Sequence, residues 1–326
     1  MLFYLVLAYI VVFYSQIGTR IPLLGSMRIE LVLGSLILVL IAAKWSQRSV
    51  DVSAPGYLNS AIVFLFVAMA LSIPGSHWKP RSIETMFTVL KGAALYMMLV
   101  STINTEDKLR KAVWVYILMD ALIVCEPFVG VFTGSAQWDT HRGYPKLMGV
   151  TGLWSHPNSL GGFAAANLAI LFFIFMVEKQ WVRKAALLGI GIASIGTIVF
   201  TGSRTAYIGV VAVVMMIWLK SSKKGVSLLF AIFVCLLIWV FAPQAYKDQF
   251  LSIQQANQVA SGQTDQNVDS SMADRWEIVQ DAWEIFIEHP IFGVGVDAFM
   301  TARGEKFNRW QDTHNLYLQI LTNIGI

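Results

Sequence analysis

The residues with the clearest capacity for chemistry lie near the end of the chain, at positions 312–317 (DTHNLY). His314 stands at the edge of an apolar segment, directly after a long polar stretch. An imidazole can serve as a general base or a general acid near neutral pH, so His314 is a candidate catalytic residue. Asn315 and Tyr317 are suited to orienting the ring or binding a hydroxylated substrate, and Asp312 is a possible partner that keeps the ring basic. A single histidine at such a boundary also has a purely structural interpretation.

Two arginines are candidates for binding an anion. Arg204 follows Ser203 at the start of an apolar segment, where Ser203 is a suitable N-cap and the free N–H groups of a helix end favour an anion. The guanidinium of Arg204 adds paired donors that fit phosphate oxygens. Arg275 is predicted in the first turn of a helix, where a cation opposes the helix dipole and therefore indicates another use. The structural alternatives are a headgroup contact for Arg204 and a surface ion pair with Asp274 for Arg275.

A second polar cluster, residues 155–158 (SHPN), precedes another apolar segment. Pro157 suits the first turn of a helix, so His156 and Asn158 either bind a substrate or only begin the helix. Arg142, in the polar stretch before them, is a further candidate for a phosphate contact.

Ionisable residues also occur inside apolar segments. Lys91 and Glu126 have equal predicted depth and are expected to form an ion pair that faces the protein interior. Asp120 lies deeper; together the three also fit a transport path. The sequence contains no P-loop, no HExxH, no Cys/His metal spacing and no GxSxG elbow, so we expect no metal and no cofactor.

The elements that must hold these residues are apolar helices. Of 326 residues, 56% are hydrophobic and only 13% are charged, too few to cover a soluble core. Long apolar stretches separated by short charged loops indicate membrane spans, and no strand-like alternation suggests a barrel. The predicted fold is therefore an all-α polytopic membrane helical bundle. The net charge of +4 is too small to indicate a nucleic-acid partner, and Cys125 and Cys235 both fall in apolar stretches, which argues against a disulfide framework.

The apolar pattern predicts about ten spans. Nine fall within 1–243, at residues 2–18, 29–43, 58–74, 84–103, 112–134, 155–177, 185–201, 204–220 and 226–243. A tenth is predicted to begin near 312, within 312–326, and to be cut off by the end of the sequence. The segment 244–311 is then one long loop.

The long loop is predicted to contain an amphipathic helix near 272–289. A capping box at residues 271–274 begins it, His289 and Pro290 end it, and its apolar stripe is expected to lie along the membrane surface. Gly293 and Gly295 are expected to form a turn.

The distribution of Lys and Arg predicts the orientation of the spans. One alternate set of short loops, including those around 44–48, 108–111, 179–184 and 220–224, carries more cations than the other. The positive-inside rule places that set and the N-terminus in the cytoplasm. Residues 155–158, residues 202–205, the long loop and His314 then all lie on the outer face.

Several stretches resemble the O-antigen ligase and O-antigen polymerase superfamily of bacterial envelope glycan transferases. The likeness is carried by residues 201–210 (TGSRTAYIGV), 274–299 (DRWEIVQDAWEIFIEHPIFGVGVDAF) and 313–326 (THNLYLQILTNIGI), and residues 155–159 (SHPNS) are similar to the family's entry to the corresponding span. Together they cover the second half of the chain. The resemblance implies a multi-pass protein of the bacterial inner membrane whose active site faces the periplasm. It also implies that the family's further spans follow residue 326, so that the sequence is a fragment.

The resemblance further implies a reaction. Members transfer a glycan from undecaprenyl diphosphate to an acceptor hydroxyl, without metal or nucleotide. By resemblance, Arg204 and Arg275 bind the diphosphate and His314 is the general base; single displacement would invert the anomeric centre. Ligation of O-antigen to lipid A–core is the first expectation. A glycan polymerase or a protein O-oligosaccharyltransferase would use the same chemistry. A transporter or flippase for a polyprenyl-linked or anionic solute is the alternative from another class.

Overall fold

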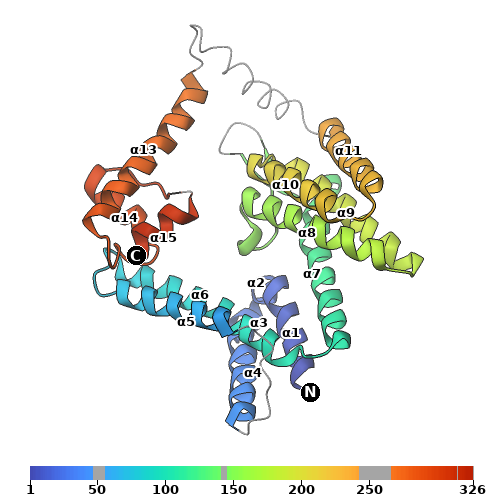
Figure 1. Cartoon of the computed structure of the whole chain (residues 1–326), viewed down its shortest axis with the longest axis horizontal. Helices are drawn as coiled ribbons and strands as arrows, with labels where there is room; N and C mark the ends of the chain where they lie inside the picture. The colour runs from blue at the N-terminus through green and yellow to red at the C-terminus, as the bar shows by residue number, and fades with distance from the viewer. Residues whose placement is uncertain (47–55, 141–144, 242–265, 314, 326) are drawn as a thin grey trace. The chain divides into compact units, whose positions relative to one another are not determined.

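The computed structural model describes residues 1–46, 56–140, 145–241, 266–313 and 315–325, and these are predominantly helical (Figure 1). The chain divides into two compact units. Unit 1 comprises residues 1–37 and 105–254, and unit 2 comprises residues 38–104 and 255–326.

Unit 1 is built from apolar helices with one small β ribbon. Its first elements are α1 (Leu2–Ser15), α2 (Ile17–Arg20), α3 (Pro22–Ser26) and the beginning of α4 (Ile29–Ser46). Next come α7 (Glu106–Thr133), β1 (Gln137–Asp139), β2 (Lys146–Met148) and the 3-10 turn η1 (Gly152–Trp154). Its last elements are α8 (Pro157–Val177), α9 (Trp181–Thr201), α10 (Arg204–Lys220) and α11 (Lys224–Phe241). The strands pair antiparallel, with Trp138 opposite Leu147; the sequence did not predict this ribbon.

The core of unit 1 lies among α7, α8, α9 and α10. Its buried members are small or aliphatic: Val124, Ala164, Ala165, Leu168, Ala193, Ile195, Ile198, Ala206 and Val210. In a membrane, where hydrophobicity alone does not drive helix association, small residues let helix backbones approach closely. These four helices are therefore tightly packed, and α8 and α10 come together near the residues considered below.

Unit 2 joins apolar helices to the C-terminal region. After the end of α4, its helices are α5 (Gly56–Ser72), α6 (Lys79–Thr102), α13 (Gln266–Glu288), α14 (Phe299–Phe307) and α15 (Leu316–Ile324). One cluster of buried residues connects α13, α14 and the turn between them: Ile278, Ala282, Ile285, Val294, Ala298, Phe299 and Ala302. The region that follows α13 is thus a packed structure and not an open loop.

The predicted turn at Gly293 and Gly295 is confirmed, since both have positive φ angles, 63° and 105°. The turn is held by main-chain bonds: the N–H groups of Val294 and Gly295 donate to the carbonyls of Thr322 and Asn323 at 2.9 and 3.0 Å. A Cβ at Gly295 would overlap Ser76 Oγ, so glycine is needed there for space as well as for conformation.

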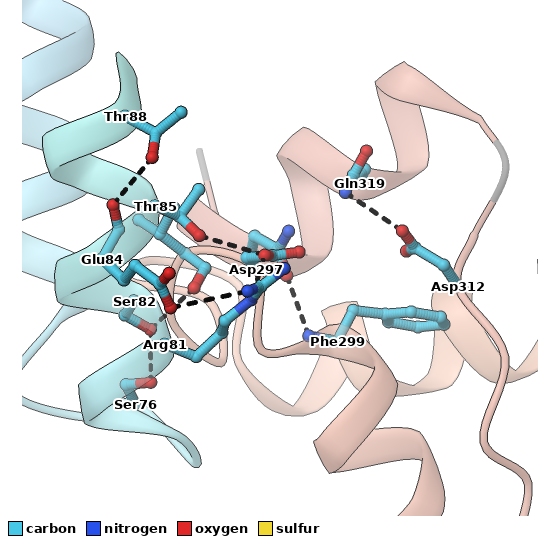
Figure 2. A network of polar contacts seen from close by, with 12 residues as sticks. Ser76, Arg81, Ser82, Glu84, Thr85, Thr88, Asp297, Phe299, Asp312 and Gln319 are labelled. Carbon is cyan, nitrogen blue, oxygen red and sulfur yellow. Dashed lines mark hydrogen bonds and ion pairs between the residues drawn. The ribbon is translucent and has the colours of Figure 1, made fainter. Parts of the chain in front are cut away.

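The residues before and within the first turns of α6 complete this junction (Figure 2). The hydroxyl of Ser82 donates to the carbonyl of Val296 at 2.7 Å and lies 2.7 Å from Ser76 Oγ. Arg81 Nε donates to Asp297 Oδ2 at 2.7 Å, and Thr85 donates to the same oxygen at 3.0 Å. Unit 2 is therefore tied together by polar contacts between segments more than two hundred residues apart in sequence.

In the part of the chain that the structure describes, four helices are long and apolar enough to cross a membrane: α6, α7, α8 and α9. Three shorter apolar stretches within the described residues are Leu2–Ser15, Gly56–Ser72 and Lys224–Phe233. The expectation of a helical membrane protein with several spans is thus confirmed, while the number ten stays a prediction. The helix at the tenth predicted span, α15, begins at Leu316 and extends only to Ile324.

Two expectations need correction. The helix in the predicted loop begins at Gln266, not 272, because no glycine or proline between 266 and 288 interrupts it. Arg275 is therefore in the helix interior, and its predicted first-turn position is wrong. The pairing of Lys91 with Glu126 is also wrong, since Glu126 accepts two hydrogen bonds from Arg20, at 2.8 and 2.5 Å.

Candidate functional site

The first group of predicted site residues lies where two helices of unit 1 begin. His156 is the N-cap of α8, and its Nδ1 accepts from the N–H of Asn158 at 3.2 Å. Ser203 is the N-cap of α10, and its Oγ accepts from the N–H of Ala206 at 3.3 Å, as the sequence predicted. The same hydroxyl donates to Asn158 Oδ1 at 2.8 Å. One hydrogen bond thus joins the N-terminal ends of two long helices.

Gly161 makes this approach possible. A Cβ there would stand 2.8 Å from Thr201 Oγ1 and 2.9 Å from Ala206 Cβ, so any larger residue would push α8 away from α10. Each helix N-terminus carries about half a positive elementary charge and several N–H groups without partners within the helix. The two adjacent ends therefore create a positive potential that favours an anion.

Arg204 is the first residue of α10 and adds a full charge to this end. Its side chain is exposed, and no acidic residue within the described ranges pairs with it. A cation at this position opposes the helix dipole. Arg204, unlike Arg275, does stand in the first turn of its helix. This position is unfavourable for stability and suitable for binding an anionic ligand.

Ser203 differs from the other three predicted site residues of this group, because its side chain is only 1% exposed and its hydroxyl both donates and accepts within the protein. It is placed to position Asn158 and α10. His156 and Asn158 are exposed. With Nδ1 accepting from the main chain, the neutral imidazole of His156 carries its proton on Nε2.

The second group lies at the start of α15 in unit 2. Asn315 is the N-cap, and its Oδ1 accepts from the N–H groups of Tyr317 and Leu318 at 3.0 and 3.4 Å. Tyr317 is 79% exposed. Thr313 is buried and donates from Oγ1 to the carbonyl of Asn315 at 3.1 Å. The residues on both sides of His314 are thus fixed by local hydrogen bonds.

Asp312 was a predicted partner for His314. Its Oδ1 accepts from the N–H of Thr313 at 2.7 Å and its Oδ2 from Gln319 Nε2 at 3.4 Å (Figure 2). His314 and Arg142 lie outside the described residues, as does the side chain of Arg275. The structure therefore brings together His156, Asn158, Ser203 and Arg204 in unit 1, and Asn315 and Tyr317 in unit 2.

Sequence reasoning missed a group of charged residues beside the second group. Arg303 on α14 is fully buried and pairs with Asp281 of α13, and Arg309 pairs with Asp281 and Glu277. An acidic face on α13 was visible in the sequence, but its partners were not, because α14 was not predicted. Within the described ranges, no three His, Cys, Asp or Glu side chains form a group able to hold a metal ion.

The helices define the class of the molecule, a multi-pass helical membrane protein. The family model described as O-Antigen ligase matches residues 189–326. Over this region, less than half of the chain, the protein is similar to that family, which confirms the predicted resemblance. The matched region includes Ser203, Arg204, Arg275, His314, Asn315 and Tyr317, whereas Arg142, His156 and Asn158 precede it. Comparisons with curated proteins and with solved structures found no match.

Proposed function

We propose that this protein is an integral-membrane glycosyltransferase that moves a glycan from undecaprenyl diphosphate to an acceptor hydroxyl on the periplasmic face. Ligation of O-antigen to lipid A–core is the favoured reaction. The observation that carries the proposal is the meeting of the N-terminal ends of α8 and α10 at the Ser203–Asn158 hydrogen bond, with Arg204 at the first position of α10. Such a site suits a diphosphate, and it lies partly within the region similar to O-antigen ligases.

The proposed chemistry is a single displacement. His314 accepts the proton of the acceptor hydroxyl, and the acceptor oxygen forms a bond to the anomeric carbon. The bond from that carbon to the phosphate oxygen breaks on the opposite face, so the configuration inverts and undecaprenyl diphosphate leaves. Arg204 and Arg275 stabilise the negative charge that develops on the leaving diphosphate.

The remaining predicted residues have supporting roles in this proposal. His156 offers Nε2–H to a phosphate oxygen, and Arg142 adds a second cation to the same part of unit 1. Asn158 lines the site, while Ser203 holds Asn158 and α10 in place. Asn315 and Tyr317, at the start of α15, bind the sugar or the acceptor.

A glycan polymerase and a protein O-oligosaccharyltransferase would use the same residues and differ in the acceptor. A transporter or flippase is the alternative from another class, and it gives His314 no chemical task. Transfer of glycan by the purified protein would distinguish the enzyme from the transporter, and the acceptor consumed would distinguish the enzymes from one another.

The test is His314→Ala in the full-length chain, reconstituted in nanodiscs with a lipid-linked donor. We expect donor binding to be retained while the transfer rate falls by about a hundredfold or more, as for a lost general base. His289→Ala is the matched control, since His289 is an exposed histidine that belongs to unit 2 and has no role in the proposed reaction, so this variant should transfer normally. Normal transfer by His314→Ala would contradict the catalytic role.

A further inference from the structure

Arg303 is the most deeply buried cation among the described residues, with 0% of its surface exposed. Its Nε donates to Asp281 Oδ2 at 2.8 Å, and its Nη1 donates to Gln311 Oε1 at 3.3 Å. Its Nη2 has no hydrogen-bond partner and lies 3.8 Å from Glu277 Oε2. The guanidinium therefore joins three pieces of unit 2: α13, its own helix α14, and the segment 309–313 that precedes α15.

The complete burial of the Arg303 guanidinium is not explained by stability alone. A buried ion pair is often no more stabilising than apolar residues of similar size, because both groups lose their hydration. A methionine in place of Arg303 would fill comparable space without that cost. What the apolar residue lacks is the geometry of the guanidinium, whose planar donors face Asp281 and Gln311 together.

The segment 309–313 is fixed at each of its five residues. Arg309 Nη2 lies 2.7 Å from Glu277 Oε1, and its Nη1 lies 3.2 Å from Asp281 Oδ2. The indole of Trp310 packs on Gly304, where a Cβ would overlap the ring.

Gln311 accepts from Arg303, and the last two residues of the segment make the local bonds described above. The residue that follows is His314. Asp281 accepts from both arginines and is the common point of attachment on α13.

We propose that Arg303 is a positioning residue, which holds the segment 309–313 against α13 and so fixes where the chain presents His314 relative to the helix that carries Arg275. This inference rests on the proposed function, in which those two residues act on one substrate. Displacement of a reacting group by about 1 Å can lower a rate a hundredfold.

The test uses three variants of the full chain in nanodiscs. Gln311→Leu removes the hydrogen bond from Arg303 to the segment and leaves the Arg303–Asp281 pair intact. Arg303→Lys keeps the buried charge but not the planar donors. Lys306→Met is the matched control, because Lys306 also ties α14 to α13, and its ion pairs go to Glu284 and Glu288, at 2.8 and 2.6 Å, instead of to the segment 309–313.

We expect Gln311→Leu and Arg303→Lys each to lower kcat by about ten- to a hundredfold with the KM for the donor unchanged. The double variant should fall no further than the single ones, because both changes cut the same link. The control should keep its kcat. An equal loss in Lys306→Met would mean that only α13–α14 packing matters, and would overturn the proposal.

Hydrogen exchange of the same variants provides a readout without activity. Amides of 309–316 should exchange faster in Gln311→Leu and Arg303→Lys, while those of 277–285 keep their protection. Unchanged protection of 309–316 overturns the proposal whether or not the protein transfers glycan. Lost protection with normal kcat overturns the positioning role alone. A wild-type protein that transfers nothing contradicts the proposed function instead, and hydrogen exchange then still reports whether the attachment exists.

Discussion

The hydroxyl of Ser203 shows how much a single side chain contributes to the arrangement of the candidate site. It caps α10 and also holds Asn158, which is 45 residues away in sequence on α8. Loss of an N-cap destabilises a helix by about 0.5–2 kcal/mol. At Ser203 the same loss would also release Asn158, so a Ser203→Ala variant combines two effects and says little about direct contact with substrate. Arg204, which is exposed, is the better residue for that question.

We expect Arg204→Gln to weaken the binding of undecaprenyl diphosphate. A hydrogen bond to a charged group contributes about 1.5–3 kcal/mol, which corresponds to a roughly ten- to more than a hundredfold loss of affinity. The measurement is a binding titration with undecaprenyl diphosphate in nanodiscs at low and high salt, and the difference between the two proteins should shrink as salt rises. Lys220→Gln, at the opposite end of α10, serves as the control. Equal affinities of Arg204→Gln and the native protein would remove Arg204 from the phosphate site.

For individual residues, the sequence allowed correct predictions only of contacts between residues close together in the chain. The capping role of Ser203 and the helix start at Pro157 follow from residues three or four positions apart, and both predictions are confirmed. The partner of Glu126 is Arg20, 106 residues away, and the predicted partner Lys91 was chosen only by estimated depth. Whether the site residues of the two units act together stays a prediction, as does the catalytic role of His314.

Among the elements, the ends of helices were predictable where a residue enforces them. The predicted stop at His289 and Pro290 agrees with the end of α13 at Glu288, and both glycines of the following turn have the conformation expected. The start of α13 was missed because a capping pattern at 271–274 looks the same inside a helix as at its beginning. The short helix α14 was missed because it is amphipathic over only nine residues.

The turn at Gly293 and Gly295 leads to a prediction about stability. Gly295→Ala would need a φ of about 105° at a residue with a Cβ, a strain of about 1–3 kcal/mol, and would also clash with Ser76 Oγ. We expect a lower thermal unfolding temperature and faster hydrogen exchange in α14 and α15.

The matched control is Gly75→Ala, one residue from Ser76, where a Cβ meets no atom within 4 Å. It should unfold like the native chain. If Gly295→Ala were as stable as Gly75→Ala, the turn would not be the structural centre of unit 2 that its contacts indicate.

For the whole molecule, the least predictable feature is which segments of the chain come together to form unit 2. The first half of the sequence offered only a series of apolar spans. The structure ties Arg81 and Ser82, at the start of α6, to the turn after α13 (Figure 2). No periodicity or motif in one sequence indicates such a contact, because it depends on side chains more than two hundred positions apart.

The predicted orientation can be tested across a single helix. After Cys125 and Cys235 are replaced by alanine, a cysteine is introduced at Gln137 or at Gln180. These exposed positions lie on the two sides of α8, which is long and apolar enough to span the membrane. A membrane-impermeant maleimide applied to intact spheroplasts should label Gln137→Cys and spare Gln180→Cys until the membrane is opened. The reverse pattern would invert the topology and place the α8–α10 site in the cytoplasm.

The ion pair between Arg20 and Glu126 has a consequence for membrane insertion. Orientation rules count Arg20 as a positive charge of the outer side, which opposes the predicted topology. Paired at 2.5–2.8 Å with two hydrogen bonds, it is neutralised by a carboxylate that belongs to a candidate span. Removing that carboxylate by Glu126→Gln would leave an uncompensated cation to be translocated. On the predicted topology, Glu126 therefore offsets the charge of Arg20 on the outer side, which links this ion pair to membrane biogenesis as well as to the folded structure.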